Sequence, residues 1–229
     1  MPLTDSPTLT PEFDEFLDLA GRARSAESDE ATRCWVDYRR FCRHVLTEWE
    51  EAPGRTRIEP YPIDYPFLRE YHDTYTTHDQ VATAKSRGMI ATTDPLVWSL
   101  WNILRPLPDN EAPWRVAVLR QSHQDACLLV GERSRTMDVY RRLPDFLRLP
   151  LRRVVQDEMV SYNGGILRAL HSGGDAGRGE AWDLVIFDEF AFQDNAPENW
   201  AAFQRAKRKL AISTVNGRGN MFSDLLDGV

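Results

Sequence analysis

The stretch Trp182 to Phe190, WDLVIFDEF, decides the fold class of this chain. Its centre, Leu184 to Phe187, holds four apolar residues, two of them β-branched, which is typical of a strand buried on both faces of a parallel sheet. Asp188 and Glu189 follow at once, and open α/β sheets bind ligands at the carboxyl ends of their strands. Such a pair can supply one carboxylate for Mg²⁺ and one to orient water beside a nucleotide. The alternative interpretation is that the pair only ends a strand and is solvated.

Outward from this stretch, short apolar runs alternate with helical patterns, which predicts an α/β fold with a mostly parallel sheet. Leu151–Ser161 and Ile166–Leu170 are predicted to form a hairpin that turns at Asn163-Gly164. The other predicted strands are 80–84, 115–119 and 211–214, and the predicted helices are 92–104, 122–142 and 197–210.

The first 75 residues are predicted to form a separate helical region, and residues 76–229 the core domain. Thr10-Pro11 is a good helix start, with a hydroxyl N-cap before a proline at the first helical position. Apolar residues recur at helical spacing from Glu30 to Glu51, which predicts one long helix. A Pro- and Tyr-rich connector over 58–66 and a short helix over 67–75 follow.

The charge is unevenly distributed along the chain. The net charge is −7, and residues 1–75 carry 16 acidic against 9 basic side chains. Gly131 to Arg153 holds seven arginines against three acids. A protein that binds nucleic acid tightly on its own is usually basic, so we expect DNA binding by one copy to be weak.

The remaining composition predicts a cytoplasmic protein. The three cysteines have no metal-type spacing, and their odd number argues against a disulfide framework. The five histidines show no HxH or HExxH spacing, so no metal site is predicted from them. The N-terminus lacks a signal-peptide pattern, and no apolar run is long enough to span a membrane.

A second motif lies upstream, between a predicted strand and a predicted helix. Lys85 to Thr93 reads KSRGMIATT, at the place where a phosphate-binding loop belongs. The common pattern GxxxxGK[ST] is absent, since the lysine stands at the front of the loop. A lysine there can still reach phosphates, because its ammonium acts as a point charge. Thr92 or Thr93 could place a hydroxyl on Mg²⁺.

These residues resemble the ATPase region of the large terminases of tailed phages, whose phosphate loop has the form K-S-R-Q-M-G-x-[ST]. Five positions match: Lys85, Ser86, Arg87, Met89 and Thr92. Two differ, because Gly88 replaces a glutamine and Ile90 replaces a glycine. A side chain at position 90 restricts φ and crowds the approach of phosphates to the backbone.

Two further segments support the same resemblance. GRGEAWDLVIFDEFA is similar to the family's Walker B stretch, which an Arg-Gly precedes, and the hairpin before it ends in NGGILRAL, as expected. Residues 212–222, ISTVNGRGNMF, are similar to the family's coupling motif S-T-P-N-G-x-G-N-x-F, with Val215 in place of proline. The three motifs follow the family's order and span residues 80–222. The resemblance implies a P-loop NTPase fold of the ASCE type with an N-terminal helical appendage.

The resemblance also implies roles for individual residues. Asp188 and Thr92 would hold Mg²⁺, and Glu189 would polarise the attacking water. The ATP-binding residues would be Lys85, Ser86, Arg87, Gly88, Thr92 and Thr93, with Ser213, Thr214 and Asn216 sensing the γ-phosphate.

Such motors close their sites with an arginine, often from a neighbouring subunit. Arg133 and Arg135 are the candidates for this catalytic arginine, with a solvated helix face as the alternative. Arg178 could sense phosphate or only support its loop.

The implied function is that of a DNA-packaging motor ATPase that uses ATP and Mg²⁺ in the host cytoplasm. The implied partners are double-stranded DNA, a portal protein, a small terminase subunit and further copies in a ring, with no membrane. A nuclease domain normally follows in the family, and neither that domain nor nuclease activity is expected within these 229 residues. The alternatives are a catalytically impaired P-loop scaffold or binding protein, which Ile90 favours, and a helicase-like ATPase.

Overall fold

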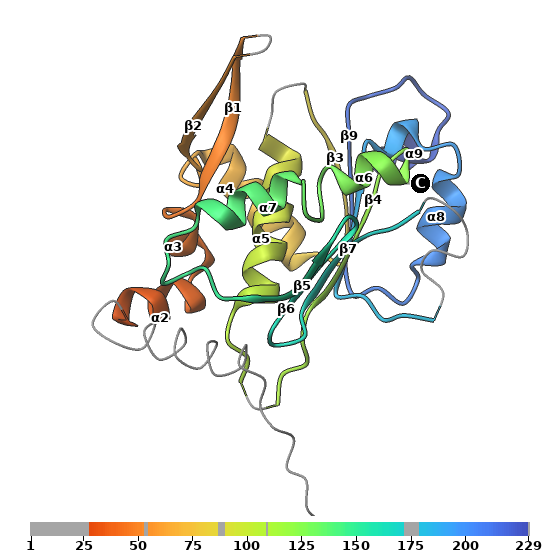
Figure 1. The fold of residues 1–229 in the computed structure, drawn as a ribbon. Helices are drawn as coiled ribbons and strands as arrows, with labels where there is room; N and C mark the ends of the chain where they lie inside the picture. Colours follow the sequence, from red (N-terminus) through yellow and green to blue (C-terminus); the bar gives the residue numbers. More distant parts are fainter. Residues whose placement is uncertain (1–27, 53–54, 87–89, 109, 172–178, 229) are drawn as a thin grey trace, which may run out of the picture.

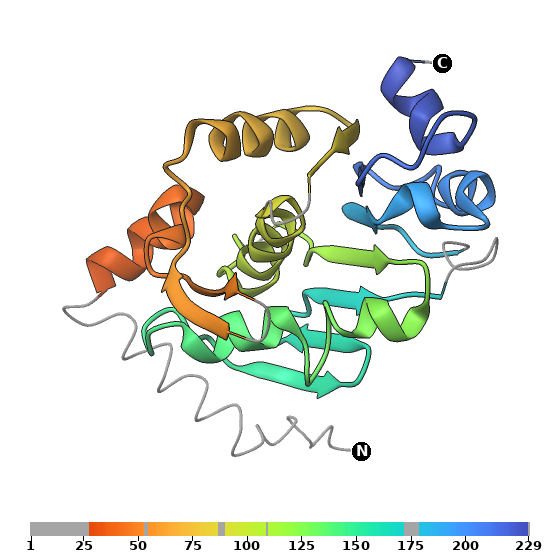
Figure 2. The ribbon, with the colours of Figure 1, turned by 90° about the horizontal axis from the view of Figure 1, so that it is seen from above.

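The computed structural model describes residues 28–52, 55–86, 90–108, 110–171 and 179–228. The predicted helix at Thr10-Pro11 lies outside these residues. Figures 1 and 2 show a twisted sheet with helices on both sides and a separate hairpin that projects beside it.

The main sheet has seven strands in the order β3-β9-β8-β4-β7-β6-β5. The first five of this order are parallel, and β6 and β5 complete the sheet in antiparallel pairings. The predicted mostly parallel α/β sheet is therefore confirmed. β9 lies between β3 and β8. The bounds are β3 Gln80–Ala84, β4 Arg115–Leu119, β5 Leu151–Val155, β6 Glu158–Ser161, β7 Ile166–Ala169, β8 Leu184–Asp188 and β9 Lys209–Ser213.

β8 is the central strand, and all five of its residues are buried. Leu184 and Ile186 belong to one hydrophobic cluster, whereas Val185 and Phe187 belong to a second on the opposite face. This alternation explains why the strand is a continuous apolar run, since each face of a parallel sheet is covered by helices. Asp188 is its last residue.

Helices cover both faces of the sheet (Figure 1). The helices in the described residues are α2 Ser28–Val36, α3 Tyr38–Cys42, α4 Pro66–Thr77, α5 Thr93–Leu104, α6 His123–Cys127, α7 Arg135–Arg142, α8 Ala196–Ala202 and α9 Met221–Asp227. Short 3₁₀ turns are η1 Ile90–Thr92 and η2 Phe190–Phe192.

The predicted helix from Glu30 to Glu51 is wrong in its second half. Asp37 has extended backbone angles and its carboxylate accepts the N–H groups of Arg39 and Arg40, so it ends α2 and caps α3. The chain then enters β1 Leu46–Ala52, which pairs antiparallel with β2 Arg55–Pro60. The region predicted to be helical thus carries a β-hairpin, and part of the predicted connector is its second strand.

The predicted helix from Ser122 to Arg142 is two helices. Ser122 caps α6 as expected, and Ser134 caps α7 by accepting the N–H of Met137. Gly131 lies between them at φ +113°, and a Cβ there would be 2.0 Å from the carbonyl oxygen of Gln156. Only glycine fits this close approach, and the turn that it makes separates the helices.

Two other boundaries differ from the prediction. The strand predicted over 151–161 is a hairpin of β5 and β6, because Val155 pairs with Glu158 across a turn. The helix predicted over 197–210 ends at Ala202, since Lys209 and Leu210 are needed to pair β9 with β3 and β8. The turn at Asn163-Gly164 is confirmed, with Gly164 at φ +89° between β6 and β7.

Candidate active site

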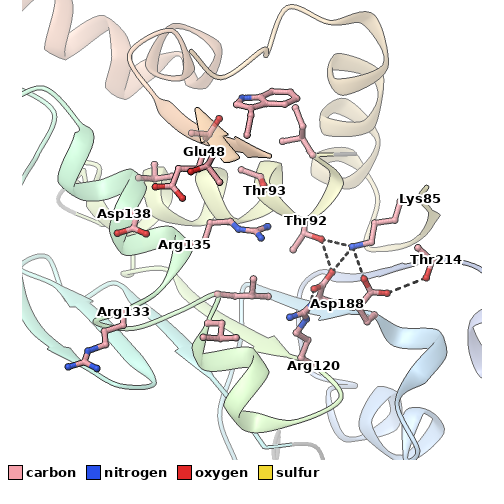
Figure 3. A pocket seen from close by; sticks show the side chains of 18 of the residues that line it. Glu48, Lys85, Thr92, Thr93, Arg120, Arg133, Arg135, Asp138, Asp188 and Thr214 are labelled. Atoms are coloured by element: carbon pink, nitrogen blue, oxygen red, sulfur yellow. Dashed lines mark hydrogen bonds and ion pairs between the residues drawn. The ribbon is translucent and has the colours of Figure 1, made fainter. Parts of the chain in front are cut away.

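Four polar side chains meet at the carboxyl end of β8. The Lys85 Nζ lies 2.8 Å from Thr92 Oγ1 and 3.1 Å from Asp188 Oδ1. It also lies 3.2 Å from Glu189 Oε1. Thr92 Oγ1 donates to Asp188 Oδ1 at 2.7 Å (Figure 3). The two motifs singled out in the sequence, about a hundred positions apart, therefore form one site.

Sheet topology places these groups together. Lys85 follows β3 directly, and its N–H donates to the carbonyl oxygen of Ser213 at 2.9 Å. Thr92 ends η1 at the start of α5 and is buried. Because β3, β9 and β8 are parallel, their carboxyl ends share one edge of the sheet, as is usual for ligand sites in open α/β folds.

Glu189 has the only positive φ of a non-glycine residue in the described part of the chain, with φ 52° and ψ 43°. Left-handed backbone at such a residue is strained and is concentrated at functional sites. The conformation turns the chain sharply after Asp188, so that the Glu189 carboxylate contacts both Lys85 and Thr214. Thr214 Oγ1 lies 3.5 Å from Glu189 Oε2.

Two residues that were not predicted from the sequence hold Asp188. Arg120 donates from Nε to Asp188 Oδ2 at 2.9 Å, and Gln193 donates from Nε2 to the Asp188 carbonyl at 3.2 Å. Arg120 immediately follows β4, the neighbour of β8. The signal was present in the sequence: a charged residue directly after a buried strand of a parallel sheet.

A pocket of about 690 Å³ opens beside these groups. One wall comes from the β1–β2 hairpin, and another comes from α7 and the turn before it (Figure 3). Its described lining residues are Thr47, Glu48, Trp49, Thr56, Lys85, Ser86, Ile90, Thr92, Thr93, Arg120, Leu128, Leu129, Arg133, Arg135, Asp138, Val139, Arg142, Asp188, Glu189 and Thr214. The hairpin that the sequence did not predict is thus part of the site.

The two candidate arginines differ in orientation. Arg135 is the first residue of α7, and its guanidinium points toward Thr92 and Thr93 of the same chain. Arg133 also lines the pocket, but its guanidinium points away from Lys85 and Asp188 (Figure 3). At the other end of α7, Arg142 forms an ion pair with Glu48 of β1, which fixes the hairpin to this helix.

The other predicted ligand residues have three outcomes. Ser86 and Thr93 line the pocket, whereas Arg87, Gly88 and Arg178 lie outside the described residues. Ser213 Oγ accepts the N–H of Ala191 at 3.2 Å, and Asn216 donates to the Ala191 carbonyl at 3.1 Å. These two side chains hold the turn that follows Glu189 and are not among the described residues that line the pocket.

Ile90 is the first residue of the 3₁₀ turn η1. The side chain lines the pocket and packs against the main hydrophobic cluster.

The oxygen atoms at the end of β8 fit Mg²⁺. Thr92 Oγ1 and Asp188 Oδ1 are 2.7 Å apart, and hydroxyl and carboxylate oxygens are the ligands that this hard cation accepts. A loop threonine and an aspartate after a buried strand are also the usual magnesium-holding pair of P-loop NTPases.

Comparison with known proteins identifies the fold. No family model and no curated protein matches the sequence. Among solved structures, the large terminase of bacteriophage HK97 superposes with a TM-score of 0.57 at 14% identity, over 82% of this chain. A large terminase from a thermophilic bacteriophage, solved in complex with ADP, matches with a TM-score of 0.39 at 13% identity, over 61% of this chain and 34% of that protein.

The chain spans 39% of the length of the HK97 protein. No helix in the described residues combines the length and the apolar character needed to cross a membrane. The resemblance found in the sequence motifs is matched by the fold, and the chain is therefore a P-loop NTPase-like α/β protein with the fold of a phage large terminase.

Proposed function

We propose that this chain is the ATPase motor domain of a viral large terminase, which hydrolyses ATP to drive DNA into a procapsid. The observation that carries the proposal is the hydrogen bond between Thr92 and Asp188, with Lys85 and Glu189 in contact with the same group of atoms. It joins a lysine-led loop to an acidic pair, and P-loop NTPases use groups of these kinds to bind phosphates and Mg²⁺.

Each of the four residues has a role in this reaction. The Lys85 ammonium binds the phosphate oxygens as a point charge. Thr92 and Asp188 would hold Mg²⁺, which when bound would neutralise charge on the phosphates. Glu189 accepts a hydrogen bond from the attacking water and polarises it, and Thr214 holds this carboxylate in place.

Arg135 is assigned to the phosphates bound in its own chain, because its guanidinium points into that chain's pocket. The role of a finger for a neighbouring subunit then falls to Arg133, whose exposed side chain points away from the site. Both arginines predicted from the sequence thus have a role, Arg135 at the phosphates of its own chain and Arg133 at those of a neighbouring subunit.

The proposed assembly is a ring of copies on a portal protein, loaded with double-stranded DNA by a small terminase subunit in the host cytoplasm. One acidic chain holds DNA weakly, and the ring adds the arginine-rich segments of its members.

Measurement of Mg²⁺-dependent ATP hydrolysis tests the proposal. We expect weak turnover in the isolated chain, a rate at least about 10²-fold lower in Glu189→Gln, and unchanged ATP binding in that variant, because an amide cannot polarise water as a carboxylate does. Lys85→Ala should weaken binding or turnover. Equal rates in wild type and Glu189→Gln would show that the role of Glu189 is wrong.

A further inference from the structure

Asp94 is a fully buried carboxylate in the first turn of α5, two residues after Thr92. It is 0% exposed. A buried carboxylate is costly unless hydrogen bonds compensate for its lost hydration. The groups that supply these bonds come from outside the P-loop core.

Four polar groups surround the Asp94 side chain. The hydroxyls of Tyr38 and Tyr61 lie 3.1 Å and 2.6 Å from Oδ1. The hydroxyl of Tyr75 and the Nδ1 of His72 lie 2.5 Å and 3.0 Å from Oδ2. These residues lie in α3, in the segment after β2, and in α4, so three separate parts of the N-terminal region converge on one carboxylate.

The same region also holds the backbone on both sides of Thr92 and Thr93. Tyr71 donates to the Ala91 carbonyl at 2.9 Å, and the Tyr38 hydroxyl lies 3.2 Å from the Asp94 carbonyl oxygen. Residues 91–94 are therefore bound at each end by tyrosines of the N-terminal region, and the magnesium-holding hydroxyl of Thr92 lies between these contacts.

The tyrosines keep their protons over a wide pH range. Burial, reinforced by the charge of Asp94, raises the pKa of Tyr38, Tyr61 and Tyr75 well above the usual value for tyrosine. The negative charge of Asp94 also lies near the N-terminus of α5, where the helix dipole favours it. The cluster thus combines charge, burial and fixed donors at the start of one helix.

We infer that Asp94 and its tyrosines are positioning residues that fix Thr92 for the reaction, which makes residues 38–75 a working part of the ATPase site. The inference rests on the proposed function. It differs from the sequence-based division into an appendage and a core, because the appendage supplies the bonds that set the geometry of the phosphate loop's last residues. Hydrogen bonds that orient a metal ligand from behind commonly change metal affinity or activity by about 10- to 100-fold.

Single-hydroxyl deletions test the inference in the full chain. Tyr75→Phe and Tyr61→Phe each remove one bond to Asp94 and keep the ring. Tyr140→Phe is the matched control, because its hydroxyl donates to the Leu149 carbonyl at 3.0 Å, outside the site. Asp94→Asn is a further variant, which removes the charge of the carboxylate. If the Asp94→Asn protein does not fold, the two tyrosine variants still test the inference.

Two readouts separate positioning from general stability. Hydrogen exchange of a peptide covering residues 90–94 should speed up in Tyr75→Phe and Tyr61→Phe but not in Tyr140→Phe. The affinity for ADP in the presence of Mg²⁺ should fall roughly 10-fold in the first two variants and stay at the wild-type value in the control.

The outcomes are distinct. Unchanged exchange over residues 90–94 in both Asp94-linked variants overturns the inference, whether or not the protein binds nucleotide. Faster exchange with wild-type ADP affinity also overturns it, because Thr92 would then be free of the cluster. Absence of nucleotide binding by the wild type refutes the proposed function, and hydrogen exchange alone then decides whether the cluster holds the loop.

Discussion

Arg120 Nε and Asp188 Oδ2 are 2.9 Å apart, across the neighbouring parallel strands β4 and β8. The contact leaves Oδ1 of the same carboxylate facing Thr92 and Lys85. One carboxylate thus has an oxygen held by an arginine and an oxygen directed into the site.

Arg120→Gln should therefore weaken Mg²⁺-dependent nucleotide binding by about 10- to 100-fold, because Asp188 loses the group that fixes its orientation. Titration of Mg²⁺ at fixed ADP measures the effect. Arg115→Gln is the control, since it removes an ion pair with Glu180 at the opposite end of the same strand. If both variants bind Mg²⁺ and ADP as the wild type does, Arg120 does not position Asp188.

Ile90→Gly should raise nucleotide affinity or turnover several-fold if Ile90 only obstructs a working site. The same substitution removes a half-buried side chain from the main cluster, so the free energy of unfolding should fall by about 2 kcal/mol. Isothermal titration with a non-hydrolysable ATP analogue and urea unfolding measure the two effects. No binding by either protein would support the scaffold alternative.

Arg135→Ala should lower turnover by on the order of 10³-fold, since arginines that reach the γ-phosphate have effects of this size in other nucleotide hydrolases. Under the proposed assignment of Arg135 to its own chain, a mixture of Arg135→Ala with Glu189→Gln should stay inactive. A mixture of Arg133→Ala with Glu189→Gln should regain activity, because an intact Glu189 is then completed by a neighbour's Arg133. The assays require conditions in which wild type assembles. Recovered activity in the Arg135 mixture would show that Arg135 acts in trans.

Glu30 should make stability depend on pH at the acidic end. Hydrogen bonds from Arg40 and then His44 lower the pKa of Glu30 from 4.5 to about 2. A carboxylate with a depressed pKa in the folded state stabilises the fold above its unfolded pKa, and this contribution is lost as pH falls from about 4.5 through about 2.

Urea unfolding of wild type and Glu30→Gln between about pH 6 and pH 2 checks this expectation. The difference in unfolding free energy should be largest above pH 4.5 and vanish toward pH 2. A difference that is the same at all pH values would mean that the ion pair with Arg40 does not shift the titration of Glu30.

The sequence predicted the features that depend on local pattern. The uninterrupted apolar run Leu184 to Phe187 identified β8, because both faces of that strand are covered. Asp188 and Glu189 follow this run directly. The lysine-led loop was placed correctly between β3 and α5, since strand, loop and helix each had their own signal. The turn at Asn163-Gly164 followed from its dipeptide.

Features that depend on distant contacts were not predictable in this way. The spacing of apolar residues from Cys34 to Trp49 fits a helix, yet pairing with Arg55–Pro60 makes the last part a strand. Gly131 looks like an ordinary residue within a helical pattern until the Gln156 carbonyl is placed against it. The same holds for Asp94, whose partners lie 19 to 56 positions away in the sequence.

Two hydrogen bonds to Ser213 connect the loop that begins at Lys85 with the turn that follows Glu189. Its carbonyl accepts the Lys85 N–H at 2.9 Å and its hydroxyl accepts the Ala191 N–H at 3.2 Å. The first residue of the lysine-led loop and the turn after Glu189 are therefore both hydrogen-bonded to the same buried residue. A movement of either segment relative to Ser213 would break one of these two hydrogen bonds, so the loop and the turn are coupled through this residue.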